Sequence, residues 1–216
     1  EIVEGLVSGN WAKNSWEQII LNYRLPKALV AIFAGVGLSI SGLQMQTFFR
    51  NPLAGPYVLG ISSGAGLGVA LLMLAGAAFG ISLTGLNSWA IAGAGILGAG
   101  SLLAIVTLVA WRVKDSMTLL IVGLMVGSVV AAVVAVLSFF SGAEALKLYT
   151  VWSMGSLGAL TWSQVSILGL LILIGSLPIV GSVKSYNALL MGETYARSMG
   201  IPTTSLRWWM IGSTGI

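Results

Sequence analysis

Side chains that could do chemistry gather in one short stretch, residues 187–201, NALLMGETYARSMGI. Glu193, Thr194, Arg197 and Ser198 lie close together there, in a chain that is otherwise 57% hydrophobic and only 7% charged. Glu193 and Arg197 are four residues apart with the acid first, the order that favours an ion pair on a helix. The stretch therefore offers a carboxylate, a guanidinium and hydroxyls on a short helix, a combination suited to polar recognition of another molecule.

Catalytic chemistry has few candidates elsewhere in the chain. The sequence contains no histidine, no cysteine and six carboxylates, none of them inside an apolar stretch. This excludes thiolate nucleophiles, imidazole bases and most transition-metal sites. Ion-coupled transporters and intramembrane enzymes usually bury an ionisable group at depth, so both classes are disfavoured. We expect no catalytic residue, no metal site and no cofactor.

One glycine motif has the spacing of a dinucleotide-binding loop. GAGILG at residues 93–98 matches that pattern, but it lies inside an apolar stretch, without the preceding strand that the fold requires. The chain also lacks a phosphate-binding P-loop motif. We therefore expect neither nucleotide binding nor nucleic-acid binding.

The polar patch lies between long stretches without charge, which must form the elements that position it. No charged residue occurs in the 61 positions between Arg50 and Arg112, which gives room for two crossings at about 20 apolar residues each. A soluble domain carries about 25% charged residues, so this chain could not cover a surface facing water. We expect an all-α, polytopic transmembrane bundle with spans at about 28–48, 57–79, 89–111, 117–140 and 163–183, and a sixth that begins after Pro202.

The segments between these spans predict two faces. Residues 1–23 are polar and should lie outside the bilayer, as should a short interfacial helix within residues 141–156. Alternating the spans places Arg50, Arg112, Lys114, Lys184, Arg197 and Arg207 on one face and Lys13, Arg24, Lys27 and Lys147 on the other. The positive-inside rule assigns the first face, with the patch, to the cytoplasm.

The patch itself should divide at Gly192 into two short helices, YNALLM and ETYARSM, with Gly200 and Pro202 ending the second. Helices this short are marginal alone in water, so other groups must hold them. Two interpretations stay open at this point: a capped loop on the membrane surface, or a docking element for a soluble subunit.

The small and amide residues within the spans have two interpretations, one structural and one functional. Gly60, Gly64 and Gly68 fall four apart, a spacing that lets helix backbones approach closely in lipid, and we favour this packing role over a substrate role. Gln44 and Gln46 lie near the inner end of the first span. A cytoplasmic gate would suit them, but hydrogen bonding between helices is the favoured interpretation.

Four ordered blocks resemble a known family. NALLMGETYARSMGI is similar to the cytoplasmic coupling segment of the iron-chelate and cobalamin importer permeases, the FecCD family of type II ABC importers. Three further blocks match in order, at residues 23–71, 119–134 and 151–162. The resemblance implies one transmembrane permease domain over residues 1–216, from a protein of about ten spans. The chain starts without Met and only nine residues follow Arg207, so we expect an internal fragment. The resemblance implies that one span is missing before residue 1 and several after residue 216.

The resemblance also implies a function. Such a chain would be a permease subunit that moves an iron–siderophore, haem or cobalamin across the inner membrane, and not itself an enzyme. Its partners would be a cytoplasmic ATPase subunit, a periplasmic or lipoprotein substrate-binding protein, and a second permease copy or paralogue. The alternative is a stand-alone secondary transporter or channel, in which residues 186–199 are a surface loop.

Site residues carried over from the family fall into three groups. The coupling helices at 186–200 would contact the ATPase through Leu189, Leu190, Met191, Gly192, Glu193, Tyr195, Ala196, Arg197 and Met199. A basic pair, Arg24 and Lys27, would meet acidic residues of the binding protein, although the family has Arg where this chain has Lys27, which loses the bidentate fork. The structural alternative is that these two side chains extend along the membrane surface and keep their charged ends in water. The pathway, along the two-fold axis of a permease dimer, would be lined by Gly123, Gly127, Ser128 and Ser138.

Overall fold

The computed structural model describes residues 11, 13–76, 87–113, 116–158 and 160–215, and the regular elements in them are all helical. The predicted all-α class is confirmed. The α-helices are α2 (Asn14–Ile19), α3 (Leu25–Phe49), α4 (Ile61–Ala70), α6 (Ser88–Arg112), α7 (Ser116–Phe140), α8 (Ala143–Ser153), α9 (Trp162–Leu190), α10 (Glu193–Ser198) and α11 (Thr203–Gly215). Three shorter turns join them: π-helices at Ile20–Arg24 and Leu71–Ala75, and a 3₁₀-helix at Pro56–Leu59.

Four helices in the described part of the chain are long and apolar enough to cross a membrane. They are Asn14–Phe49, Ser88–Arg112, Met117–Phe140 and Trp162–Leu190, which confirms the spans predicted at 28–48, 89–111, 117–140 and 163–183. Their outer faces expose large apolar side chains, among them Leu97, Phe139 and Val180 at 76%, 83% and 76%. Such faces suit contact with lipid and would be costly in water.

The span predicted at residues 57–79 differs from the structure. The apolar stretch gives a 3₁₀-turn at Pro56–Leu59 followed by a helix, Ile61–Ala75, that is shorter than the four spans. Gly60 separates the two pieces with a left-handed backbone, φ 74°, which glycine adopts without steric cost. This helix therefore begins later than the predicted residue 57 and is followed as far as residue 76. Residues 77–86 lie outside the described part, so the predicted end of this span stays a prediction.

The start of the first span also differs from the prediction. The interfacial segment was expected over residues 1–23, of which 1–10 and 12 lie outside the described part. Residues 14–24 are helical and continue into α3, so that one helix of 36 residues runs to Phe49. Pro26 does not interrupt it, although proline usually breaks a helix interior, because a π-turn at Ile20–Arg24 precedes it. At 1.5 Å per residue this helix exceeds the roughly 30 Å hydrocarbon core. One end must therefore project from the bilayer.

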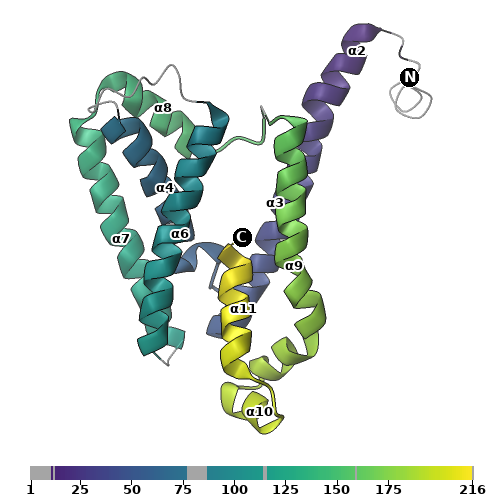
Figure 1. Ribbon diagram of the computed structural model, residues 1–216, viewed down its shortest axis with the longest axis vertical. Coiled ribbons are helices and arrows are strands. Elements are labelled where there is room, and N and C mark those ends of the chain that lie inside the picture. Colours follow the sequence, from purple (N-terminus) through teal and green to yellow (C-terminus); the bar gives the residue numbers. More distant parts are fainter. Residues whose placement is uncertain (1–10, 12, 77–86, 114–115, 159, 216) are drawn as a thin grey trace.

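The predicted pair of short helices is half correct. Residues 186–190 are the last turn of α9, a helix of 29 residues, and not a separate helix. α9 bends along its length (Figure 1), and Pro178 lies inside it, the residue that most often kinks a helix. Gly192 then ends the element with φ 121°, and α10 follows as the second predicted helix.

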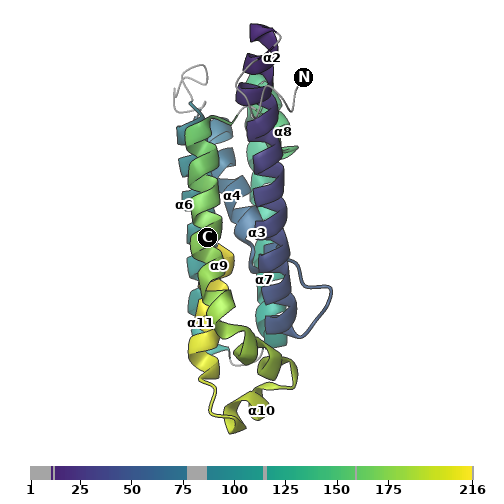
Figure 2. The same ribbon diagram turned by 90° about the vertical axis from the view of Figure 1, so that its right-hand side faces the viewer.

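Two groups of helices make up the molecule. α4, α6, α7 and α8 lie on one side in Figure 1, while α3 and α9 run side by side on the other, with α11 between the groups. α2 and α10 lie at opposite ends of the long axis, as Figure 2 also shows. The predicted docking pair, Arg24 and Lys27, is therefore far from the patch.

Glycines build the contact between α4 and α6. A Cβ at Gly64 or Gly68 would overlap the backbone of α6 at Gly98 or Ala94, and a Cβ at Gly98 would overlap the Gly64 carbonyl oxygen. The two backbones thus touch directly, which is how small residues join helices in lipid. Gly60, predicted to share this face, instead precedes the helix at its N-cap.

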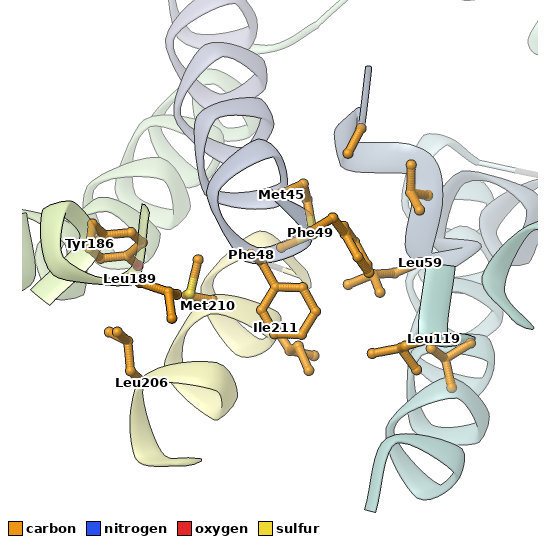
Figure 3. Packing of buried hydrophobic residues seen from close by; sticks show 13 residues of the cluster. Met45, Phe48, Phe49, Leu59, Leu119, Tyr186, Leu189, Leu206, Met210 and Ile211 are labelled. Carbon is orange, nitrogen blue, oxygen red and sulfur yellow. The ribbon is translucent and has the colours of Figure 1, made fainter. Parts of the chain in front are cut away.

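The main apolar core lies where the two groups meet (Figure 3), and it includes Leu189 and Leu206, which flank α10 in the sequence. It draws residues from most of the long helices: Met45, Phe48 and Phe49 from α3, Val106 from α6, Leu119 from α7, Tyr186 and Leu189 from α9, and Leu206, Met210 and Ile211 from α11, with Ala54, Val58 and Leu59 from the connection before α4. Any displacement of α10 therefore acts beside the point where the helices converge.

Candidate functional site

Backbone geometry fixes the start and the end of α10. Gly192 precedes it in a conformation open only to glycine, φ 121° and ψ 150°. At the other end the Gly200 N–H donates to the Arg197 carbonyl oxygen at 2.9 Å, and the Ile201 N–H donates to that of Ala196 at 3.1 Å. With Gly200 at φ 79° this is a Schellman ending, so the stop predicted at Gly200 is confirmed.

A polar clamp joins α10 to the start of α11. Arg197 Nη2 donates to Glu193 Oε1 at 2.7 Å, and Arg197 Nε donates to Thr203 Oγ1 at 3.1 Å. Thr203 is buried at the N-terminus of α11. The Arg197 side chain is 62% exposed, so the ion pair is worth at most about 1 kcal/mol. The clamp sets the orientation of α10 more than it stabilises the fold.

The predicted contact residues divide between two faces. Leu189 and Ala196 are buried within the chain's own core, Ala196 completely. The outward face exposes 56% of Leu190, 72% of Met191, 48% of Tyr195 and 59% of Met199. Four large apolar side chains thus gather on the end of the bundle, beyond the long spans. We call these four residues the α10 surface.

Arg50 lies beside the α10 surface. The sequence placed it on the same face as the patch but did not predict it as a site residue. It is the residue after α3 and adopts a left-handed backbone, φ 47°, held by the Asn51 N–H donating to the Gln46 carbonyl oxygen at 3.1 Å. A non-glycine residue rarely adopts this conformation. Arg50 lines an open hollow of about 660 Å³ together with Met191, Gly192, Glu193, Thr194, Tyr195 and Ser198.

The opposite end of the molecule carries the basic pair. Arg24 and Lys27 are exposed and lie three residues apart on the continuous helix of α2 and α3. Lys27 lines a shallow hollow with Tyr23, Leu157 and Thr161. The indole N–H of Trp162 donates to the Leu21 carbonyl oxygen at 3.2 Å. That bond ties the start of α9 to the helix that bears the basic pair.

The residues predicted to line a pathway occupy different surroundings on α7. Gly123 is buried, and a Cβ there would overlap the Val58 carbonyl oxygen, while a Cβ at Gly127 would lie 3.3 Å from Ser63 Oγ. Ser128 is exposed and Ser138 is half-buried. The two glycines thus pack against residues in and just before α4, and Ser128 is the one of these four residues that is exposed.

Of the two glutamines, Gln44 makes the hydrogen bonds between helices that the sequence favoured, and Gln46 does not. Gln44 Oε1 accepts from the Tyr186 hydroxyl at 3.0 Å and from Ser213 Oγ at 2.8 Å, which joins α3 to α9 and α11. Gln46 Nε2 donates to the Pro52 carbonyl oxygen at 3.2 Å and so stays within its own connection. Within the part of the chain that the structure describes, no cluster of three acidic residues could hold a metal ion.

Comparison with known proteins settles the family. The model of the FecCD transport family matches residues 1–216. The chain belongs to the FecCD transport family. It is 32% identical over 210 residues to the vitamin B12 import system permease protein BtuC of Citrobacter koseri, and 33% identical over 207 residues to BtuC of Escherichia coli. These matches cover 97% and 96% of this chain but 62% and 61% of the relatives, so the chain spans about three fifths of their length.

One solved structure has the same helix arrangement. A metal-chelate type ABC transporter, captured in an inward-facing conformation, superimposes with a TM-score of 0.83 at 29% identity, over 97% of this chain and 65% of that one. Together with the four apolar helices, this confirms a transmembrane permease fold. The protein is a multi-pass protein of the inner membrane.

Proposed function

We propose that this chain is the permease subunit of an ATP-binding-cassette importer, and that α10 with the last turn of α9 docks into its cytoplasmic ATPase subunit. The observation that carries the proposal is the α10 surface, which exposes Leu190, Met191, Tyr195 and Met199 at one end of the bundle, beyond the spans. An apolar cluster that faces water is unfavourable unless another molecule covers it.

The charges around the α10 surface suit a partner with acidic side chains. Arg50 lines the hollow beside it, and Arg197 is largely exposed although its Nη2 is paired with Glu193. An apolar centre with a charged rim is typical of protein–protein interfaces, and arginine is enriched among their anchoring residues. Arg50 therefore joins Gly192, Glu193 and Arg197 as a proposed polar contact.

The position of α10 supports a route for mechanical coupling. It follows α9 after a single turn at Gly192 and is clamped to α11 through Thr203. Leu189 and Leu206, on either side of it, belong to the core where both helix groups meet. A push on α10 by a closing ATPase would thus reach the spans directly, with Leu189 and Ala196 acting as the inner anchor.

The far end of the molecule would receive the substrate-binding protein. Arg24 and Lys27 are exposed on a helix that projects beyond the bilayer, where they are open to acidic residues of a partner. A second permease copy or paralogue would complete the pathway along the two-fold axis, with the exposed Ser128 of α7 on the side away from the buried Gly123 and the half-buried Ser138 near the end of the same helix. We place the α10 face in the cytoplasm by the positive-inside rule.

The cargo that we propose is a cobalamin or an iron chelate such as a siderophore complex or haem. Relatives with about a third of residues identical are named for vitamin B12 import, and the similar structure is of a metal-chelate type transporter. A cargo that is already chelated does not need charged ligands in the wall of the pathway. This agrees with the four long apolar helices, in which the single carboxylate is Glu17, close to the start of the first.

Transport by the full-length protein tests the proposal. Reconstituted in vesicles with the neighbouring ATPase and binding protein, it should accumulate cobalamin or a ferric siderophore only when ATP is hydrolysed and the binding protein is present. The same assay with both kinds of cargo identifies the chelate. Uptake by the permease alone, driven by an ion gradient, would instead establish a stand-alone secondary transporter.

A further inference from the structure

Gln44 occupies the crossing of three helices at the inner part of the bundle. Its side chain is 2% exposed, and its Oε1 accepts the hydroxyl protons of Tyr186 at 3.0 Å and Ser213 at 2.8 Å. A buried amide with two such bonds is well satisfied at one end. These bonds connect positions 142 and 169 residues away along the chain.

The other end of the same amide has no partner. Gln44 Nε2 is buried and makes no hydrogen bond within the described residues, and neither does Thr214 Oγ1 on α11. Rotating the amide by 180° would exchange the two ends but would still leave one of them unpaired. Buried polar atoms are nearly always hydrogen-bonded in native proteins, and ordered water supplies the bond when the protein does not.

A cavity lies at this crossing. It has a volume of about 220 Å³ and is lined by residues of α3, α9 and α11 that include both Gln44 and Thr214. Two further hydroxyls line it, those of Ser41 and Ser176, which donate to the carbonyl oxygens of Gly37 at 2.8 Å and Leu173 at 2.9 Å. Their oxygens keep lone pairs that can accept a hydrogen bond.

We propose that this partly open cavity is a water site, in which bound water bridges Gln44 Nε2 and Thr214 Oγ1. Water needs two to four polar partners and about 30 Å³ of space per molecule, and the cavity provides both. The amide N–H groups donate to it, the Thr214 hydroxyl donates or accepts, and the serine oxygens accept. A lipid tail would fill the volume but would leave the amide unpaired.

Water at this site would allow α9 to shift relative to α3. Tyr186 lies in the last turn of α9, next to α10, so its bond to Gln44 links the α10 surface to α3. If α10 is displaced, water already in the cavity can replace the Tyr186 hydroxyl as donor to Gln44 without leaving a buried group unpaired. This consequence rests on the proposed function, whereas the water site itself does not.

Water-edited solid-state NMR of the full-length protein in lipid, with ¹⁵N-labelled glutamine, tests the site. The side-chain amide of Gln44, identified by its absence in Gln44→Leu, should receive polarisation from water about as fast as the exposed Gln18. Thr214→Val keeps the size of the side chain but removes the partner for water, and we expect the transfer to be lost. Thr214→Ser, the matched control, should retain it.

Two results would overturn the water site. One is a wild-type Gln44 amide that receives polarisation only from protein or lipid; the other is transfer that persists unchanged in Thr214→Val. A high-resolution map of the wild-type full-length protein provides an independent check that needs no variant. Density for water between Gln44 and Thr214 supports the proposal, and a protein side chain in that place refutes it. Neither measurement depends on whether an ATPase binds.

Discussion

The α4–α6 contact and the α10 surface differ in what holds them in place. In the first, Gly64, Gly68 and Gly98 bring two backbones into direct contact, so that no side chain could be added. In the second, α10 rests on buried Leu189 and Ala196 while Met191 and Tyr195 remain exposed. The first region has all its contacts within this chain. The second is complete on one face and open on the other, which is what a docking element needs.

The glycine contact should give the largest effect on stability. Gly98→Val places a branched side chain against the backbone of Gly64 and Gly68, and we expect it to cost at least about 3 kcal/mol through overpacking. The matched control is Gly100→Val on the same helix, where a Cβ would meet nothing within 4 Å. Thermal unfolding in detergent measures both. Equal unfolding temperatures for Gly98→Val and Gly100→Val would contradict the direct backbone contact between α4 and α6.

The clamp on α10 should give an intermediate effect. Thr203→Val keeps the buried volume but removes the acceptor for Arg197 Nε, which we expect to cost about 1 kcal/mol. Amide hydrogen exchange in α10 should become faster while exchange in α4 and α6 stays unchanged. Thr204→Val, an exposed neighbour, is the control. Unchanged protection of α10 in Thr203→Val would show that the clamp does not hold it.

The basic pair should give the smallest effect on the fold. Arg24→Glu alters an exposed side chain, so we expect stability within about 0.5 kcal/mol of the wild type. Binding of the substrate-binding protein should weaken, because the reversed charge would face acidic residues, while association with the ATPase persists. Arg24→Lys should largely restore binding. Equal loss of both partners in Arg24→Glu would make the residue structural.

Local patterns in the sequence predicted much of this molecule. Apolar length gave four spans, glycine and proline gave the end of α10, and the four-residue spacing gave the Glu193–Arg197 pair. These features depend on neighbours within a few positions. The break at Gly60, which delays the start of α4 to Ile61, was missed, because composition alone does not show where a glycine adopts a left-handed backbone.

Contacts distant in sequence were not predictable from these patterns. Arg50 meets the start of α10 across more than a hundred positions, and Gln44 finds its donors on α9 and α11. The sequence also grouped Ala196 with the exposed contact residues, whereas it is completely buried. A bulky substitution at Ala196 would therefore disturb the packing of α10 itself, and it cannot test docking.

The most direct test of the central proposal is co-purification of the full-length protein with its neighbouring ATPase. Met191→Glu with Tyr195→Glu alters only exposed side chains of the α10 surface, and Val151→Glu with Met154→Glu makes the same change on exposed residues around the end of α8. We predict that the first pair loses the ATPase while the second retains it, both with wild-type thermal stability. Retention of the ATPase by the first pair, or no association in the wild type, would contradict the assignment of α10 as the coupling element.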